Sequence, residues 1–380
     1  MTTTARVLIA ADKFKGSLTA VEVAERVTAG IHAVRPEARV EALPVADGGD
    51  GTVDAAVASG FERRETDVTG PTGAPVRAAF ALHAESFTAV VEMAEASGLQ
   101  HLPPGAFAPL TATTYGTGEL LRAAVAAGAR TIVFGVGGSA TTDGGAGMLE
   151  ALGARFLDED GDPVPHGGGP LREMVSADLS GLDERLQNVE FVLASDVDNP
   201  LTGPKGAPAV YGPQKGASEE DVAVLDAALE HFAKILGESV GERASQAAQA
   251  PGAGAAGGIG YGALVGLNAR FRPGIEVLLE VLGFAAALDR ADLVITGEGS
   301  LDEQTLHGKA PAGVAAAARR EGKPVLAVCG RLAIDRKALK GAGIERAYAL
   351  TDLEPDPQTC IANAGPLLEQ AASQLAENHL

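Results

Sequence analysis

The sequence contains very little cysteine and no tryptophan. Its 380 residues include only 2 cysteines, 4 tyrosines and 11 phenylalanines. Two cysteines, Cys329 and Cys360, are too few for a disulfide framework or a thiolate metal site, and we expect a buried, inert thiol at Cys329 and a cytoplasmic location. The hydrophobic fraction of 46% is that of an ordinary globular protein, which excludes a disordered chain.

Basic residues and long apolar runs are also scarce. Fifty acidic residues against 30 basic ones give a formal net charge of −20, which repels nucleic acid and anionic membranes. Glu280 interrupts the longest apolar run, and the run at residues 7–11 is shorter than the core of a signal peptide. We therefore expect no nucleic-acid partner and no membrane, and an anionic ligand would have to be held by local groups.

The common nucleotide-binding signatures are missing. Gly308-Lys309 is followed by Ala310 and preceded at the required spacing by Glu303, so the phosphate-binding pattern G-x-x-x-x-G-K-[ST] is absent. The protein-kinase H-R-D motif is absent, and no G-x-G-x-x-G opens the first helix. A kinase activity would therefore have to use another scaffold.

Two glycine-rich loops of one pattern are present instead. An apolar strand at residues 131–136 leads into a loop at 137–145 and a helix from about Ala146, and residues 143–147 read Asp-Gly-Gly-x-Gly. The same pattern at 47–51 follows a strand at 40–46 and precedes a helix at 52–58. Such a loop can turn its backbone N–H groups around a phosphate beside a helix N-terminus. The alternative is a tight turn that binds nothing.

The pattern of elements predicts an α/β protein with two domains. A strand, helix and strand at 6–11, 19–34 and 40–46 form one βαβ unit, and strands at 291–296, 324–328 and 347–350 alternate with helices at 312–321 and from 358 onward. We predict a discontinuous Rossmann-like parallel-sheet domain from residues 1–70 and 290–380. Residues 71–289 would form an inserted α/β domain with a mixed sheet that carries the glycine-rich loop at 137–145.

Polar residues that suit phosphoryl transfer follow several of these strands. Ligands of parallel α/β sheets bind at the carboxyl ends of the strands, and a kinase needs a phosphate cradle, carboxylates for Mg²⁺ and a cation. The candidate carboxylates are Asp47, Asp143, Asp196 and Glu298, and the candidate cations are Lys15, Lys215 and Lys309. As an alternative, Asp143 and Asp302 could cap turns. The segment at 251–262 could be a flexible linker or a site of close backbone packing.

Several stretches together resemble the type I glycerate kinases of bacteria. The matching segments are ADKFKGSLTAVEVA (11–24), PVADGGDGTVDA (44–55), TTYGTGEL (113–120), GVGGSATTDGGAGMLEALG (135–153), SDVDNPLTGPKGA (195–207), YGPQKGA (211–217), PGAGAAGGIGYG (251–262) and ITGEGSLDEQTLHGKAPAGVA (295–315). Departures are small: the family commonly has Glu at position 50, where this chain has Asp50, and Ala-Cys-Asp where it has Ala194-Ser195-Asp196.

The resemblance implies ATP-dependent phosphorylation of D-glycerate to 2-phosphoglycerate, with Mg²⁺ as the metal. It also implies an active site in the cleft between two α/β domains and a place in glyoxylate, sugar-diacid or serine-linked carbon metabolism. Phosphorylation of C3, or of another small hydroxy acid, is the alternative activity, and a non-catalytic ligand-binding regulator is the alternative from another class. We expect a monomer or a homodimer.

On this reading the site residues are expected to converge on one crevice. We expect catalysis from Lys15, Asp47 and Asp196, and metal binding by Asp47, Asp196 and Glu298. We expect the substrate to be bound by Lys215, Arg331 and Asn199. We expect nucleotide contacts from Gly137, Gly138, Ser139, Thr141, Gly144, Gly254 and Gly257.

Overall fold

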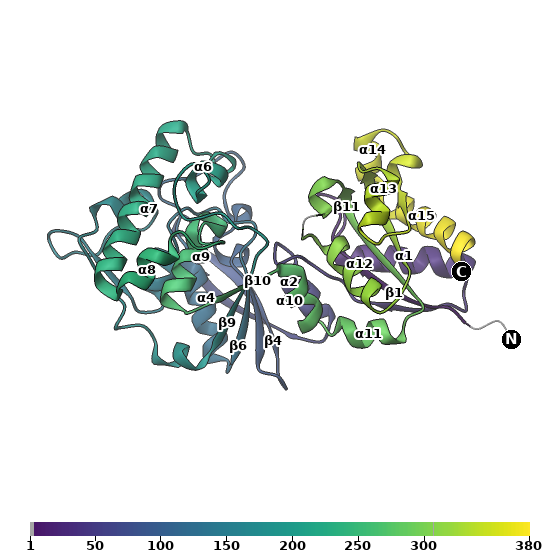
Figure 1. Cartoon of the computed structure of the whole chain (residues 1–380), viewed down its shortest axis with the longest axis horizontal. Helices are drawn as coiled ribbons and strands as arrows, with labels where there is room; N and C mark the ends of the chain where they lie inside the picture. The colour runs from purple at the N-terminus through teal and green to yellow at the C-terminus, as the bar shows by residue number, and fades with distance from the viewer. Residues whose placement is uncertain (1–3, 307) are drawn as a thin grey trace. The chain divides into compact units, whose positions relative to one another are not determined.

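The protein folds into two compact units in a computed structural model that describes residues 4–306 and 308–380. One unit comprises the residues up to Asp47, Asp54–Gly60 and Pro273–Leu380, and the other comprises Gly48–Val53 and Phe61–Arg272. The first unit contains the purple and yellow ends of the chain, and the second contains its middle (Figure 1). The domain limits predicted at residues 70 and 290 stay a prediction. His307, which belongs to one of the segments quoted above, lies outside the described residues.

Both ends of the chain build the parallel sheet of the first unit. Its strand order is β13-β12-β11-β1-β2, and every neighbouring pair is parallel. The strands are β1 (Arg6–Ala11), β2 (Arg39–Ala42), β11 (Leu293–Leu301), β12 (Val325–Leu332) and β13 (Arg346–Ala349). Ile9 in β1 is aligned with Ala42 on one side and with Ile295 on the other. This arrangement confirms the predicted Rossmann-like sheet.

Helices cover this sheet. They are α1 (Ala20–Val34), α10 (Gly274–Val281), α11 (Phe284–Arg290), α12 (Ala310–Arg320), α13 (Arg336–Gly341), α14 (Pro357–Ala362) and α15 (Ala364–His379), with short 3₁₀ turns at Glu303–Leu306 and Leu350–Asp352. Val7 and Ile9 share one hydrophobic core with residues of α1 and α15, and α12 packs against β11 and β1. A Cβ on Gly30 of α1 would lie 2.2 Å from the Glu369 carbonyl oxygen of α15. Glycine therefore permits this close helix contact.

The second unit contains the predicted mixed sheet. Its order is β10-β9-β6-β5-β4-β3, in which β10, β9, β6 and β5 are parallel and β4 and β3 are antiparallel. These strands are β3 (Glu62–Thr69), β4 (Pro75–His83), β5 (Thr88–Glu92), β6 (Thr131–Gly135), β9 (Glu190–Ala194) and β10 (Arg270–Arg272), and a small hairpin pairs β7 (Arg155–Leu157) with β8 (Ser176–Asp178). Strand β3 lies in the range predicted for the first domain but pairs with β4.

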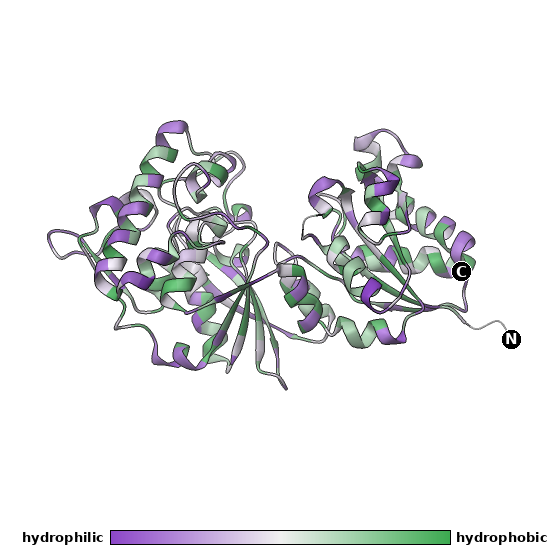
Figure 2. Ribbon diagram, in the orientation of Figure 1, coloured by the Kyte–Doolittle hydropathy of each residue, from purple (hydrophilic) through white to green (hydrophobic). Residues whose placement is uncertain are grey.

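Helices and short turns complete the second unit. The helices are α3 (Ala94–Ser97), α4 (Tyr115–Ala126), α5 (Ala146–Ala151), α6 (Ala207–Tyr211), α7 (Glu219–Val240), α8 (Glu242–Ala247) and α9 (Ala255–Gly266), and α2 (Thr52–Ala58) spans the passage between the units. Turns of 3₁₀ helix lie at Leu99–His101, Gly169–Glu173, Glu184–Asn188 and Pro213–Lys215. Helix α7 begins at a capping box of Ser218 and Asp221. Hydrophobic residues gather on the strands and on the inner sides of the helices (Figure 2).

The two cysteines are both buried and are not joined in a disulfide. Burial raises the pKa of the Cys329 thiol, which agrees with the expected inert thiol. In the described part of the chain, no helix combines the length and the apolar character needed to cross a bilayer.

Candidate active site

Three carboxylates gather at the carboxyl ends of strands in the first unit. Ala11, the last residue of β1, is aligned with Gly297 of β11, so Asp12 and Glu298 follow at one edge of the sheet. Burial, together with the nearby charges of Asp47 and Glu298, raises the pKa of Asp12 to about 7. Asp47 and Glu298 were predicted for the site, but Asp12 was missed. Its position directly after an apolar strand was the available signal.

Glu298 is held by a hydroxyl and a lysine. It is 7% exposed, it accepts a hydrogen bond from the Thr305 hydroxyl, and its Oε2 lies 3.8 Å from the Lys309 Nζ. Burial raises the pKa of Glu298, and Thr305 and Lys309 oppose that shift. Asp302 instead accepts hydrogen bonds from the N–H groups of Gln304 and Thr305. It therefore caps the turn, as the alternative interpretation held.

Two exposed cations lie at the same edge of this sheet. Lys15 belongs to the turn that follows β1, and Arg331 lies on β12 in register with Ser300 of β11. A Cβ on Gly299 would lie 3.2 Å from the Lys15 amide nitrogen, so Gly299 leaves room for the turn. The Ser300 hydroxyl is buried and has no hydrogen-bond partner among the described residues. This edge therefore presents cations, carboxylates and a hydroxyl together.

In the second unit, the two glycine-rich loops touch each other. A Cβ on Gly137 would lie 2.6 Å from the Gly49 Cα, and a Cβ on Gly135 would lie 2.6 Å from the Gly48 carbonyl oxygen. Gly48 has a φ of +90°, and a Cβ there would lie 2.8 Å from the Ala194 carbonyl oxygen. Glycine allows these backbones to approach the ends of β6 and β9. The loop at 47–51 thus lies against the end of β6 and the first residue of the loop at 137–145.

Glu92 fixes the start of α2 against β5, and sequence reasoning missed it. Its carboxylate accepts hydrogen bonds from the N–H groups of Gly51 and Val53. Glu92 is 3% exposed, and burial raises its pKa to about 8 although the backbone donors oppose the shift. A glutamate at the end of the apolar stretch 88–93 was the signal in the sequence, since a charge in a buried strand needs a partner.

The loop at 137–145 has an outer and an inner half. Gly138 is exposed and Gly137 is half-buried, whereas Ser139, Thr141 and Gly144 are buried. On one side, backbone hydrogen bonds tie the loop to residues 97–99, with Leu99 N–H donating to the Gly138 carbonyl at 3.0 Å. The outer half, residues 137–139, therefore contains the two glycines that a ligand in solution can reach first, and the buried Ser139 ends it.

Lys215 lies beneath this loop. It is 2% exposed, and its Nζ donates to the Ser139 Oγ at 2.7 Å and to the Thr141 carbonyl oxygen at 2.5 Å. Burial lowers the pKa of Lys215 to about 7, and the charge of Asp143 opposes that shift. We predicted that Lys215 binds substrate, but in the structure its ammonium group is directed at the loop.

Asp143 ties the inner half of the loop to two helices. Its Oδ2 accepts hydrogen bonds at 2.8 Å from both the N–H and the hydroxyl of Thr114. It also accepts from the N–H groups of Gly145 and Gly147 at 3.1 and 3.3 Å. These contacts join the N-termini of α4 and α5, so Asp143 has the capping role that the alternative interpretation gave it.

The glycine-rich segment 251–262 packs closely against the same inner half. Gly257 has a φ of +78°, and a Cβ there would lie 1.9 Å from the Thr141 carbonyl oxygen. A Cβ on Gly254 would lie 2.2 Å from the Pro200 carbonyl oxygen, and the Gly144 N–H donates to the Gly257 carbonyl at 3.1 Å. Of the two alternatives, close backbone packing is confirmed. Thr141, Gly144, Gly254 and Gly257 are buried in the structure, and their predicted contacts with the nucleotide stay a prediction.

Asp196 and Asn199 follow β9 but differ in their surroundings. Asp196 is exposed at the surface. The Asn199 Nδ2 donates to the Lys205 carbonyl oxygen at 2.8 Å, and its Oδ1 accepts from the Tyr211 hydroxyl at 2.6 Å. Both ends of the Asn199 amide are thus used to brace the following turn, whereas the Asp196 carboxylate lies at the surface, where a ligand can reach it.

The predicted metal ligands are divided between the units. Asp47 and Glu298 belong to the first unit and Asp196 to the second, so their convergence on one crevice stays a prediction. Within residues 4–306 and 308–380, no group of three or more His, Cys, Asp or Glu side chains is arranged to hold a metal ion. A magnesium ion that arrives with a nucleotide needs only one or two carboxylates, because phosphate and water supply the other ligands. Asp47, Asp196 and Glu298 suit a site of this kind, in which the nucleotide supplies part of the coordination.

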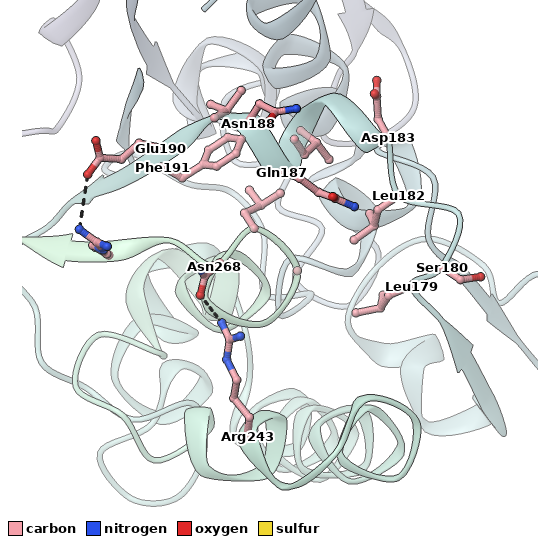
Figure 3. A pocket seen from close by; sticks show the side chains of 15 residues that line it. Leu179, Ser180, Leu182, Asp183, Gln187, Asn188, Glu190, Phe191, Arg243 and Asn268 are labelled. Carbon is pink, nitrogen blue, oxygen red and sulfur yellow. Dashed lines mark hydrogen bonds and ion pairs between the residues drawn. The ribbon is translucent and has the colours of Figure 1, made fainter. Parts of the chain in front are cut away.

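A separate hollow of about 870 Å³ lies at the amino end of β9. Figure 3 shows Arg243 and Asn268 on one side of it, and Gln187 and Asn188 on another. Its arginines are engaged: Arg243 donates to the Asn268 Oδ1, and Arg270 lies 3.7 Å from the Glu190 carboxylate. The predicted site residues, all of them described, are not among its lining residues. The hollow is at the opposite end of the strands from the glycine-rich loops.

Comparison with known proteins gives one consistent result. The sequence model of the glycerate kinase family matches residues 7–380. The glycerate kinase of Bacillus subtilis is 46% identical over 98% of this chain and 97% of its own length, and the glycerate 2-kinase of Escherichia coli is 42% identical over 91% and 90%. A crystal structure provisionally named glycerate kinase 2, from Salmonella typhimurium LT2, superimposes with a TM-score of 0.85 at 41% identity over 99% of this chain and 98% of that one.

Proposed function

This chain belongs to the glycerate kinase family, and we propose that it phosphorylates D-glycerate on C2 with ATP to give 2-phosphoglycerate. The observation that carries the proposal is the full-length similarity to a relative named glycerate 2-kinase, which covers 91% of this chain. The gathering of carboxylates and cations at the strand ends of the first unit supports it, because phosphoryl transfer depends mainly on positioning and charge. Cytoplasmic glyoxylate, sugar-diacid or serine-linked carbon metabolism is the proposed setting.

We assign the nucleotide phosphates to residues 137–139, the outer half of the loop at 137–145. Gly138 is exposed and Gly137 is half-buried there, and a glycine backbone can approach a phosphate closely. Asp47, Asp196 and Glu298 are the carboxylates that would hold Mg²⁺. The ion, when bound, would neutralise charge on the phosphates.

The glycerate carboxylate is assigned to Lys15 and Arg331, the exposed cations at the strand ends of the first unit. A cation paired with this carboxylate fixes the orientation of the hydroxyl that attacks the phosphoryl group. Asp47 or Asp196 would accept the proton of that hydroxyl. These roles rest on residue type, exposure and position at strand ends.

A substrate panel tests this function. Release of ADP would be followed by a coupled assay with D-glycerate, L-glycerate, glycolate and tartronate, and ³¹P NMR of the product would distinguish C2 from C3. We expect the highest kcat/KM with D-glycerate and a 2-phospho product. Preferred turnover of another acid, or a 3-phospho product, would contradict the proposal. ATP hydrolysis that does not depend on any of the four acids would contradict it as well.

A further inference from the structure

Lys215 is a buried lysine that has no role in the reaction proposed above. Removing an ammonium group from water is costly unless hydrogen bonds compensate for the lost hydration. Lys215 compensates with two short bonds, to the Ser139 hydroxyl and the Thr141 carbonyl oxygen. Since both partners belong to the loop at 137–145, the compensation is obtained only when this loop has its present shape.

The two bonds span the boundary between the halves of the loop. Ser139 is the last residue of the outer half, and Thr141 belongs to the buried half that packs against Gly257. The residue after Ser139 is also held, because the Ala140 N–H donates to the Ser97 carbonyl oxygen at 3.0 Å. The outer half is thus held by backbone bonds to residues 97–99 and by the Lys215 ammonium.

The same geometry argues against contact between Lys215 and the glycerate carboxylate. The side chain is 2% exposed, and a carboxylate could reach the ammonium only by displacing the Ser139 hydroxyl or the Thr141 carbonyl. Displacement would leave a buried polar group without a partner, which is unfavourable.

We propose that Lys215 is a positioning residue for the nucleotide: by holding Ser139 and Thr141 together, it fixes residues 137–139 in the shape that binds the phosphates of ATP. The inference rests on the proposed function insofar as it takes a nucleotide as the occupant of the loop. It replaces the predicted role of Lys215 in substrate binding. Lys215 itself contacts the loop and not the nucleotide.

The test uses Lys215→Met, which keeps the length and apolar stem of the side chain and removes the ammonium. Isothermal titration calorimetry with ADP gives the nucleotide affinity, and steady-state kinetics give the KM for D-glycerate at saturating ATP. We expect the Kd for ADP to rise about tenfold or more, because a small misplacement of binding groups is costly. The KM for D-glycerate should change less than about twofold. The matched control is Lys234→Met, an exposed lysine on α7, which should leave both constants unchanged.

A second variant, Ser139→Ala, removes one of the two acceptors and keeps the charge. It should weaken ADP binding in the same selective way by a smaller factor, and the double variant should be no weaker than Lys215→Met alone, because one interaction is removed in both. If Lys215→Met does not fold, as judged by circular dichroism, an unchanged Kd for ADP in Ser139→Ala still overturns the proposal.

An unchanged Kd for ADP overturns the proposal, as does a rise in the KM for D-glycerate equal to or greater than the loss of ADP affinity. The ADP measurement needs no glycerate, so it remains decisive if the panel finds another acceptor. Absence of ADP binding in the unmodified protein would contradict the kinase function and this inference together.

Discussion

Lys15 and Lys215 look alike in the sequence, yet their surroundings give them different roles. Each is followed by a glycine with a φ of +83°, and each was a candidate cation for the site. In the structure Lys15 is exposed beside Gly299, whereas Lys215 is buried against Ser139, a residue 76 positions away. Sequence reasoning found both lysines. It could not distinguish their roles, because burial depends on contacts between remote segments.

The exposed lysine gives the first test at this scale. Replacing Lys15 by Ala should lower kcat/KM for D-glycerate on the order of 100-fold or more, because the lost charge orients the acceptor and stabilises the transition state. Steady-state kinetics on the folded variant would measure the loss. Lys337→Ala, an exposed lysine on α13 of the same unit, should retain full activity. Near-normal turnover of Lys15→Ala would remove Lys15 from the active site.

The buried carboxyl group of Glu92 predicts a dependence of stability on pH. Its pKa in the folded protein is about 8, well above the value of roughly 4.3 in an unfolded chain. The folded protein therefore binds the Glu92 proton more tightly, and the free energy of unfolding should fall as pH rises from about 4.3 to about 8. Glu92→Gln cannot titrate, so it should gain stability relative to the unmodified protein over this range, by on the order of 2 kcal/mol.

Thermal melts at pH 5, 6.5 and 8 would measure this difference as a change in Tm. Other groups that titrate in this range, such as Asp12, are present in both proteins and cancel. Glu85→Gln changes an exposed carboxylate close to β5 and should show a constant difference in Tm across the three pH values. A constant or decreasing difference for Glu92→Gln would show that the carboxyl group is not held in its protonated form by burial.

At the scale of elements, the most informative segment is the glycine-rich stretch that becomes α9. Ala256, Gly257 and Gly258 have non-helical angles with positive φ inside this helix, and hydropathy alone gave no reason to expect them. The sequence showed an excess of glycine without showing what the backbone approaches. The partner, Thr141, belongs to another loop, so the linker and packing alternatives could be distinguished only in the folded chain.

This packing gives a stability prediction. Gly257→Ala should lower Tm by several degrees or more, because it combines a positive φ with a Cβ placed 1.9 Å from the Thr141 carbonyl oxygen. The matched control is Gly161→Ala, which has a φ of +81° and nothing within 4 Å of the added Cβ. It should show the smaller effect of backbone strain alone, about 1–2 kcal/mol. Equal losses in the two variants would contradict close packing as the cause.

Strand and helix positions were largely predictable, and the errors have local causes. The run at 40–46 predicted a strand, yet β2 ends at Ala42. Leu43 and Val45 still donate to the carbonyls of Ile9 and Ala11, so the backbone continues beside β1 beyond the regular strand. An apolar run indicates a buried, extended segment. It does not indicate the residue at which regular strand pairing ends.

At the scale of the whole molecule, the alternation of strands and helices at both ends of the chain was sufficient to predict one parallel sheet. Crossover connections and parallel pairing follow from general rules of α/β folds. The carboxylate cluster could be predicted in part, because Asp47 and Glu298 follow apolar segments. Asp12 and Glu92 obey the same rule but were overlooked. The precise site requires knowledge of which side chains are buried, and a sequence shows this only indirectly.

The position of β1 between β2 and β11 also has a consequence for biosynthesis. On the ribosome, residues 6–11 emerge long before their neighbours at 293–301, and at ordinary synthesis speeds the wait is on the order of tens of seconds. The six-stranded sheet needs nothing beyond Arg272, so it can form while translation continues. The strand made first therefore has one unpaired edge until β11 has been synthesised.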